Sequence, residues 1–101
     1  MDQPEGYLMI KVGSEKPYRE TIERNKGSKR FLESFLETIH SLGFELLNDE
    51  HPKRKVVITS YALDDSVPRK YHKIHTFKFW IESDESGSWI NVNSTYPWRA
   101  M

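Results

Sequence analysis

Hydrophobic and polar positions alternate along residues 74–96, and this alternation predicts a β-hairpin with two different faces. We place the loop at residues 84–87, so that Ser83 lies opposite Ser88. The register then gives three further pairs: Ile81–Ile90, Phe79–Val92 and Phe77–Ser94. A slip by one residue would turn every side chain over, so a mostly apolar face fixes the register. The other face carries Lys78, Trp80, Glu82, Trp89, Asn91 and Asn93.

Residues 29–42 have the apolar spacing of a helix, with side chains at i, i+4, i+8 and i+11. The stripe consists of Phe31, Phe35, Ile39 and Leu42, widened by Leu32 and Leu36. Ser28 can cap the N-terminus, and Gly43 stands where a left-handed C-terminal cap belongs. We therefore expect the helix to end at residue 42 and residues 44–47 to form a short strand.

Two more segments read as strands, residues 7–12 and residues 55–63, because they combine alternation with many β-branched side chains. Residues 18–24 alternate weakly and fit either a strand or one or two helical turns. The predicted fold class is α+β. We expect a single domain over residues 1–101, in which an antiparallel sheet of four to five strands carries one principal helix on one face.

One helix covers only one face of such a sheet, so the second face must be exposed or covered by a partner. We expect Val56, Ile58 and Ala62 to point towards the helix. The side chains expected on the opposite face, beside Trp80 and Trp89, are Val57, Thr59, Tyr61 and Leu63.

Composition narrows the function classes. The chain has 101 residues, 30% charged residues and a formal net charge of zero, so it lacks the basic excess of a typical nucleic-acid-binding domain. It contains no cysteine, which excludes disulfides, thiolate metal sites and cysteine nucleophiles. Residues 1–5 do not resemble a signal peptide, and no window is long enough for a membrane span. We expect a soluble, cytoplasmic protein that does not bind membranes.

The predicted open face is the first candidate binding surface, formed by Tyr61, Lys78, Trp80, Trp89, Asn91 and Asn93. In one interpretation, Trp80 and Trp89 form a diagonal cross-strand pair that only stabilises the hairpin. In a second, the face binds a protein, because tryptophan and tyrosine supply large contact areas. In a third, the rings stack on the bases of single-stranded nucleic acid. Between the two functional interpretations the sequence favours a protein partner, and a homodimer competes for the same surface.

The helix start is the second candidate, an anion-binding site at Ser28, Lys29 and Arg30. Cations at a helix N-terminus oppose the macrodipole, and free backbone N–H groups there can hold a phosphate or carboxylate. The alternative is a solvated basic turn neutralised by nearby glutamates. The basic runs at residues 53–55 and 69–73 lie close to predicted acidic loops, and we expect these charges to compensate each other.

No catalytic or metal-binding pattern occurs in the sequence. His72 and His75 should point to opposite faces of an extended strand, and no ligand spacing typical of zinc is present. No nucleophile motif and no carboxylate pair in an apolar pocket is recognisable. We therefore expect a non-catalytic macromolecule-binding protein, such as an inhibitor, adaptor or immunity-type protein, without a cofactor.

Overall fold

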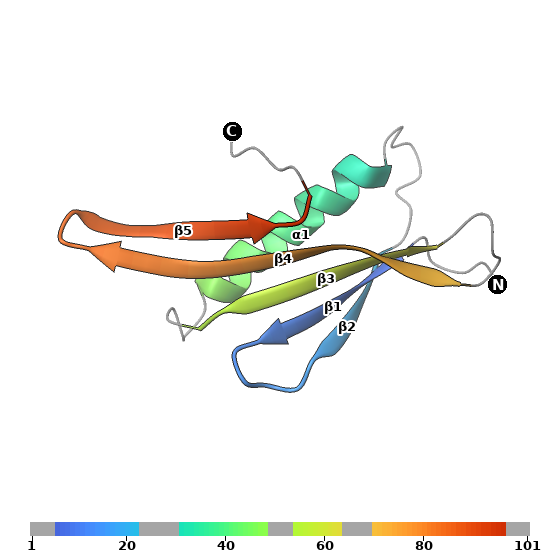
Figure 1. The fold of residues 1–101 in the computed structure, drawn as a ribbon, viewed down its shortest axis with the longest axis horizontal. Helices are drawn as coiled ribbons and strands as arrows, with labels where there is room; N and C mark the ends of the chain where they lie inside the picture. Colours follow the sequence, from blue (N-terminus) through green and yellow to red (C-terminus); the bar gives the residue numbers. More distant parts are fainter. Residues whose placement is uncertain (1–5, 23–30, 49–53, 64–69, 97–101) are drawn as a thin grey trace.

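The structure is a computed structural model that describes residues 6–22, 31–48, 54–63 and 70–96, with the helical side chains from Phe35 onward. Its elements are β1 (Gly6–Val12), β2 (Tyr18–Ile22), α1 (Phe31–Leu47), β3 (Val56–Leu63), β4 (Tyr71–Asp84) and β5 (Gly87–Ser94). The strands form one antiparallel sheet in the order β2-β1-β3-β4-β5, and α1 lies across one face (Figure 1). The predicted α+β class is confirmed.

The hairpin of β4 and β5 has the predicted register, including the Ser83–Ser88 pair. Pairing continues by one residue to Asp84 and Gly87, which leaves a two-residue loop. Gly87 has a φ of 138°, in the region that favours glycine. Asp84 Oδ1 accepts hydrogen bonds from the Ser86 hydroxyl at 2.6 Å and from its backbone N–H at 2.7 Å, and these bonds lower the pKa of Asp84.

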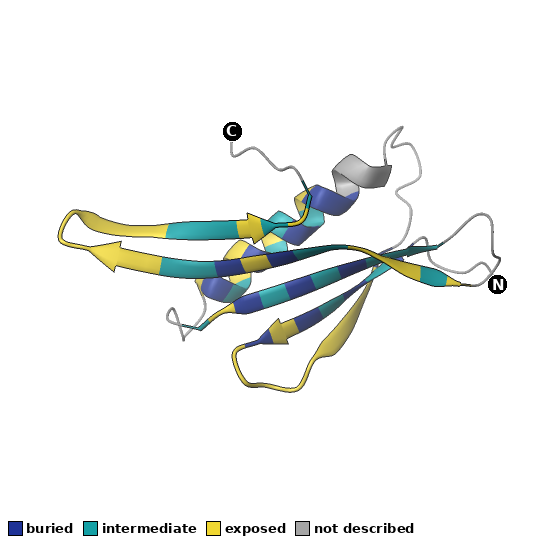
Figure 2. Cartoon of the chain, in the orientation of Figure 1, coloured by how far each residue is buried: buried dark blue, intermediate teal, exposed yellow. Residues whose placement is uncertain are grey.

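The hydrophobic core lies between α1 and the sheet, because alternate strand residues point towards the helix. Figure 2 shows the resulting alternation of buried and less buried residues along the central strands. Val56 and Ile58 are fully buried there, as predicted. The other buried strand side chains are Leu8, Ile10, Val12, Ile22, Phe77 and Phe79. The helix contributes Phe35, Leu36, Ile39 and Leu47. The sheet thus has one face committed to the core.

The predicted end of the helix is wrong. Helix α1 continues through Gly43 to Leu47, so residues 44–47 are helical and do not form a strand. Gly43 is not a cap: a Cβ atom there would lie 2.8 Å from the ring of Phe79, so the residue lets the helix approach the sheet closely. At the true C-terminus, Arg54 Nη2 donates a 2.7 Å hydrogen bond to the Leu46 carbonyl, which satisfies a free helical acceptor.

Residues 18–22 form strand β2, which pairs with β1 from Gly6–Ile22 to Ile10–Tyr18. Of the two alternatives predicted for this segment, a strand or one or two helical turns, the structure shows the strand. The register between β3 and β4 shifts after Ser60, where the pairing moves from Ser60–His75 to Tyr61–Lys73. A β-bulge of this kind adds one residue to one strand and restores the alternation of side chains beyond it.

The β4–β5 hairpin extends beyond the rest of the sheet. Strand β3 pairs with β4 only as far as Val56, opposite Phe79. From Trp80 onward, β4 pairs only with β5, and Figure 1 shows this part reaching past the ends of β3 and α1. We call residues 80–91 the hairpin arm. Its residues Ile81 and Ile90 are partly buried and pack against the core, which anchors the base of the arm.

The helical content of the described ranges is α1 alone, and α1 is too short and too polar for a membrane span.

Replacing Gly43 with alanine should lower the free energy of unfolding. Alanine gains up to about 1 kcal/mol of helix propensity over glycine. Overpacking against the buried ring of Phe79 costs about 1–3 kcal/mol and should outweigh that gain. Urea denaturation measures the difference. The matched control is Ser41→Ala on the exposed side of α1, which should be neutral or slightly stabilising. A more stable Gly43→Ala variant would show that the contact with Phe79 is not close.

Candidate functional site

The face of the sheet that points away from α1, the open face, gathers residues from all five strands. The strand registers bring them together in rows, such as Arg19, Met9 and Thr59, or Lys11, Val57 and Lys78. Its main side chains are Tyr7, Met9, Lys11, Arg19, Lys55, Val57, Thr59, Tyr61, Tyr71, Lys73, Lys78, Trp80, Glu82, Trp89, Asn91 and Asn93. All six binding residues predicted from the sequence lie on this face.

Three tyrosines form a cluster at one end of the open face. The ring of Tyr7 stacks on that of Tyr61, with 4.7 Å between centroids and 12° between planes. The third ring, Tyr71, packs edge-to-face with Tyr7, and their ring centroids are 5.1 Å apart. The guanidinium of Arg19 lies 4.2 Å from the Tyr7 centroid, a cation–π geometry. Of this tyrosine cluster, sequence analysis identified only Tyr61, because the others become neighbours only through strand pairing.

Two tryptophans occupy the other end of the open face, on the hairpin arm. Trp80 lies opposite Asn91 and Trp89 opposite Glu82, so the two indoles are diagonal neighbours as predicted. Trp80 Nε1 donates a 3.0 Å hydrogen bond to Glu82 Oε1, and Lys55 Nζ lies 5.4 Å from the Trp80 ring centroid. Trp89 remains 43% exposed. Both tryptophans thus present ring surface beside a charged side chain.

The remaining predicted binding residues lie between the tryptophans and the centre of the sheet. Lys78 is paired with Asn93, and both side chains are exposed. The Nδ2 atom of Asn91 is buried and has no hydrogen-bond partner within the described part of the chain. A buried amide without a partner costs about 1–3 kcal/mol. Asn91 is therefore a group that gains from a new acceptor.

Charge is divided between the two sides of the molecule. The open face carries the cations Lys11, Arg19, Lys55, Lys73 and Lys78. Its acidic positions within the described strands, Glu82 and Asp84, lie on the hairpin arm. The helix side carries Glu20, Glu37 and Glu45. Among the described residues, cations therefore outnumber acidic side chains on the open face, whereas the helix side carries these three glutamates together with Arg54.

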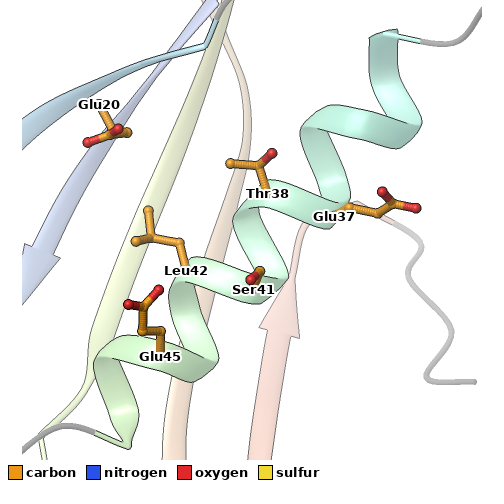
Figure 3. Close-up of a pocket in the computed structure, with 6 residues that line it drawn as sticks. All are labelled: Glu20, Glu37, Thr38, Ser41, Leu42 and Glu45. Atoms are coloured by element: carbon orange, nitrogen blue, oxygen red, sulfur yellow. The ribbon is translucent and has the colours of Figure 1, made fainter. Parts of the chain in front are cut away.

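The acidic side includes a groove between β2 and α1 that sequence analysis missed. It has a volume of about 510 Å³ and is lined by Glu20, Glu37, Thr38, Ser41, Leu42 and Glu45 (Figure 3). Glu20 comes from β2 and the other residues come from α1, so no local pattern could reveal it. Within the described ranges, His, Asp and Glu side chains do not gather in groups of three or more that could hold a metal ion.

The predicted anion site at Ser28, Lys29 and Arg30 lies outside the described residues, as do Lys53 and Arg69 of the basic runs. That site therefore remains a prediction from sequence. The cationic surface described above does not depend on it.

The prediction that His72 and His75 point to opposite faces is wrong. They pair with Ala62 and Ser60, which share one face of β3, because the bulge supplies an extra residue between them. His75 is further held by its Nδ1 contact with the Thr95 hydroxyl at 3.1 Å. Its backbone N–H also donates a 3.2 Å hydrogen bond to the Ser60 hydroxyl. These contacts give His75 a structural role at the bulge.

No protein-family model, no curated protein and no solved structure matches this chain. The geometry of the chain itself is thus the basis for assigning a function. The strongest geometric signal is the combination of rings and cations on the open face.

His40 should make stability depend on pH. It lies edge-on to the rings of Phe44, Phe77 and Phe79, and burial lowers its pKa from the ordinary value of 6.5. The unfolded chain then binds a proton at a pH where the folded protein does not, so the free energy of unfolding should fall as pH drops through about 6.5.

Urea denaturation between pH 7.5 and 5.5 measures this dependence. The variant His40→Gln should show a smaller loss of stability on acidification than the unmodified protein, while His72→Gln serves as the control that removes an exposed imidazole. Equal pH dependence in the unmodified protein and His40→Gln would contradict the assignment.

Proposed function

We propose that the protein is a non-catalytic binding protein whose open face binds single-stranded nucleic acid. The observation that carries this proposal is that aromatic rings and cations lie together on the face that α1 leaves uncovered. The sequence favoured a protein partner because the net charge is zero. The excess of cations over acidic side chains among the described residues of the open face weakens that objection, since local potential rather than net charge steers a ligand.

The cations are placed to contact a phosphate backbone beside each group of rings. Arg19 and Lys73 flank the tyrosine cluster, and Lys55 lies at Trp80. Lys11 and Lys78 lie on either side of Val57, two strand spacings apart, which is roughly 10 Å. A backbone that crosses the sheet between the two aromatic ends therefore passes cations along its whole path.

The rings are spaced for more than one base. Tyr61 is six residues from Lys55, the neighbour of Trp80, so the two aromatic ends lie roughly 20 Å apart along the sheet. Unpaired bases stack on aromatic side chains largely without sequence preference, whereas the bases of a duplex are already stacked and paired. Arg19 and Tyr61 lie against the ring of Tyr7, so the rings proposed to stack on bases are those of Tyr61, Trp80 and the exposed Trp89.

A protein partner is the second candidate, and the hairpin arm is the observation in its favour. The arm projects beyond the sheet, carries an exposed Trp89 and holds the acidic positions of the open face. Exposed tryptophans are enriched at the energetic centres of protein interfaces. This candidate predicts binding that depends on Trp89 and is little affected by the central lysines.

Titration with single-stranded DNA and RNA oligonucleotides at low salt should quench tryptophan fluorescence. Trp80→Ala should weaken binding by about 1–3 kcal/mol if one base stacks on the indole. Each phosphate contact contributes about 0.7 to the slope of log K against log salt concentration, so the double variant Lys11→Gln/Lys78→Gln should reduce that slope by roughly 1.4.

The single variant Lys78→Gln has a matched control in Lys16→Gln, which also removes one charge but from the turn between β1 and β2. The control should leave both the affinity and the salt dependence nearly unchanged. Absence of binding at high micromolar oligonucleotide, or equal effects of Lys16→Gln and Lys78→Gln, would end the nucleic-acid proposal. The protein-partner proposal would then be tested by pull-down with a Trp80→Ala/Trp89→Ala variant.

A further inference from the structure

The two edges of the sheet differ in how well they are protected against pairing. Edge strand β2 has five residues and carries the charged pair Arg19 and Glu20. Edge strand β5 has eight residues, contains no charge and no proline, and pairs with β4 without interruption. Sheet edges in monomeric proteins are usually short, charged or interrupted, because a long regular edge pairs with other strands.

The backbone groups of β5 that are free to pair can be assigned. In an antiparallel ladder, alternate residues bond to the neighbouring strand. The Thr95 N–H donates to the Thr76 carbonyl at 3.1 Å, which fixes the phase: the odd-numbered residues of β5 bond to β4. The N–H and C=O groups that point away from β4 are those of Ser88, Ile90, Val92 and Ser94.

We propose that β5 pairs antiparallel with β5 of a second copy, about a twofold axis at Asn91 and perpendicular to the sheet. Ser88 then lies opposite Ser94 of the second copy, and Ile90 lies opposite Val92 of the second copy. All four outward-pointing residues become hydrogen-bonded pairs in this register. The product is one continuous sheet of two five-stranded halves.

The side chains of β5 complement themselves in this register. On the helix side, Ile90 and Val92 are both partly buried, and pairing joins their apolar surfaces across the axis. On the open side, the exposed Trp89 meets Asn93 of the second copy. No like charges meet within the pair, since β5 has no charged residue. A second copy is therefore the partner that the strand fits, and the two open faces continue into each other on the same side.

Asn91 is the residue that faces itself across the axis. It occupies a pair without backbone hydrogen bonds, for which Cα atoms lie about 4.5 Å apart. Its Nδ2 atom has no hydrogen-bond partner within the described part of the chain, and the carboxamide of the second copy supplies an acceptor once the side chain turns towards it. An axis at this position would therefore let the two Asn91 carboxamides pair with each other.

Cysteine cross-linking tests the register, because the chain contains no natural cysteine. The expected Cα separation in Asn91→Cys falls within the range of about 4.4–6.8 Å that a disulfide requires. The matched control is Asn93→Cys on the same strand and face. Its two copies would lie about four residues apart along the strands, roughly 13 Å, which is too far for a disulfide. Mild oxidation should therefore give a disulfide-linked dimer with Asn91→Cys and little with Asn93→Cys.

Sedimentation velocity across a dilution series tests the unmodified protein, which should dimerise at the higher concentrations. Asn91→Lys brings two ammonium groups together and should dissociate that dimer, whereas Asn93→Lys should not. A strict monomer at every concentration, or equal cross-linking of the two cysteine variants, would overturn the proposal. Far-ultraviolet circular dichroism of the reduced variants confirms that each is folded. The proposal is independent of nucleic-acid binding, which the fluorescence titration measures separately.

Discussion

The close contact between one helix and one side of the sheet is the constraint on which the rest of the structure depends. Helix α1 approaches the sheet at Gly43, where the ring of Phe79 occupies the space of a side chain. This approach buries alternate residues of the strands and commits that face to the core. With no second helix among the described elements, the other face consists of side chains that contact each other and solvent. The exposure of the open face therefore follows from the packing of α1 against the opposite face of the sheet.

On the open face, aromatic rings lie beside cationic side chains. Arg19 covers one side of Tyr7, and Lys55 lies near Trp80, so ring surface that would otherwise be exposed contacts charged groups. Glu20, Glu37 and Glu45 line the groove beside β2 on the helix side, whereas Glu82 and Asp84 lie on the hairpin arm of the open face. Under the proposed function, the cations of the open face would attract an anionic ligand to that side, although the chain as a whole is neutral. A charged ligand is steered to one face by the local distribution of charge and does not require a net charge on the whole chain.

The hairpin and the face assignments could be predicted from sequence because they depend on alternation over short distances. In the β4–β5 hairpin, one register places the apolar side chains of both strands on the same face, and the structure has that register. The end of the helix could not be predicted in this way. Gly43 has the sequence signature of a C-terminal cap, but tertiary packing against Phe79 determines its role. Likewise, the bulge that places His72 and His75 on one face has no local signal of its own.

The candidate site could be predicted only in part. Residues on one hairpin, such as Trp80 and Asn91, were identified because their partners are close in sequence. Tyr7 was missed because its neighbours Tyr61 and Arg19 become adjacent only when β1 is inserted between β2 and β3. The division of charge was missed for the same reason, since composition sums over both sides. Long-range strand order, rather than any single motif, assembles this surface.

The central claim is that the two faces of one sheet have separate roles, with ligand on the open face alone. Adjacent residues of the same type allow a direct test: Val57 points to the open face, while Val56 is fully buried against the helix. Methyl NMR spectra recorded during oligonucleotide titration should show shifts for Val57 and Met9, with Val56 and Ile58 nearly unchanged. Larger shifts at Leu42, in the groove beside β2, than at Val57 would contradict the account.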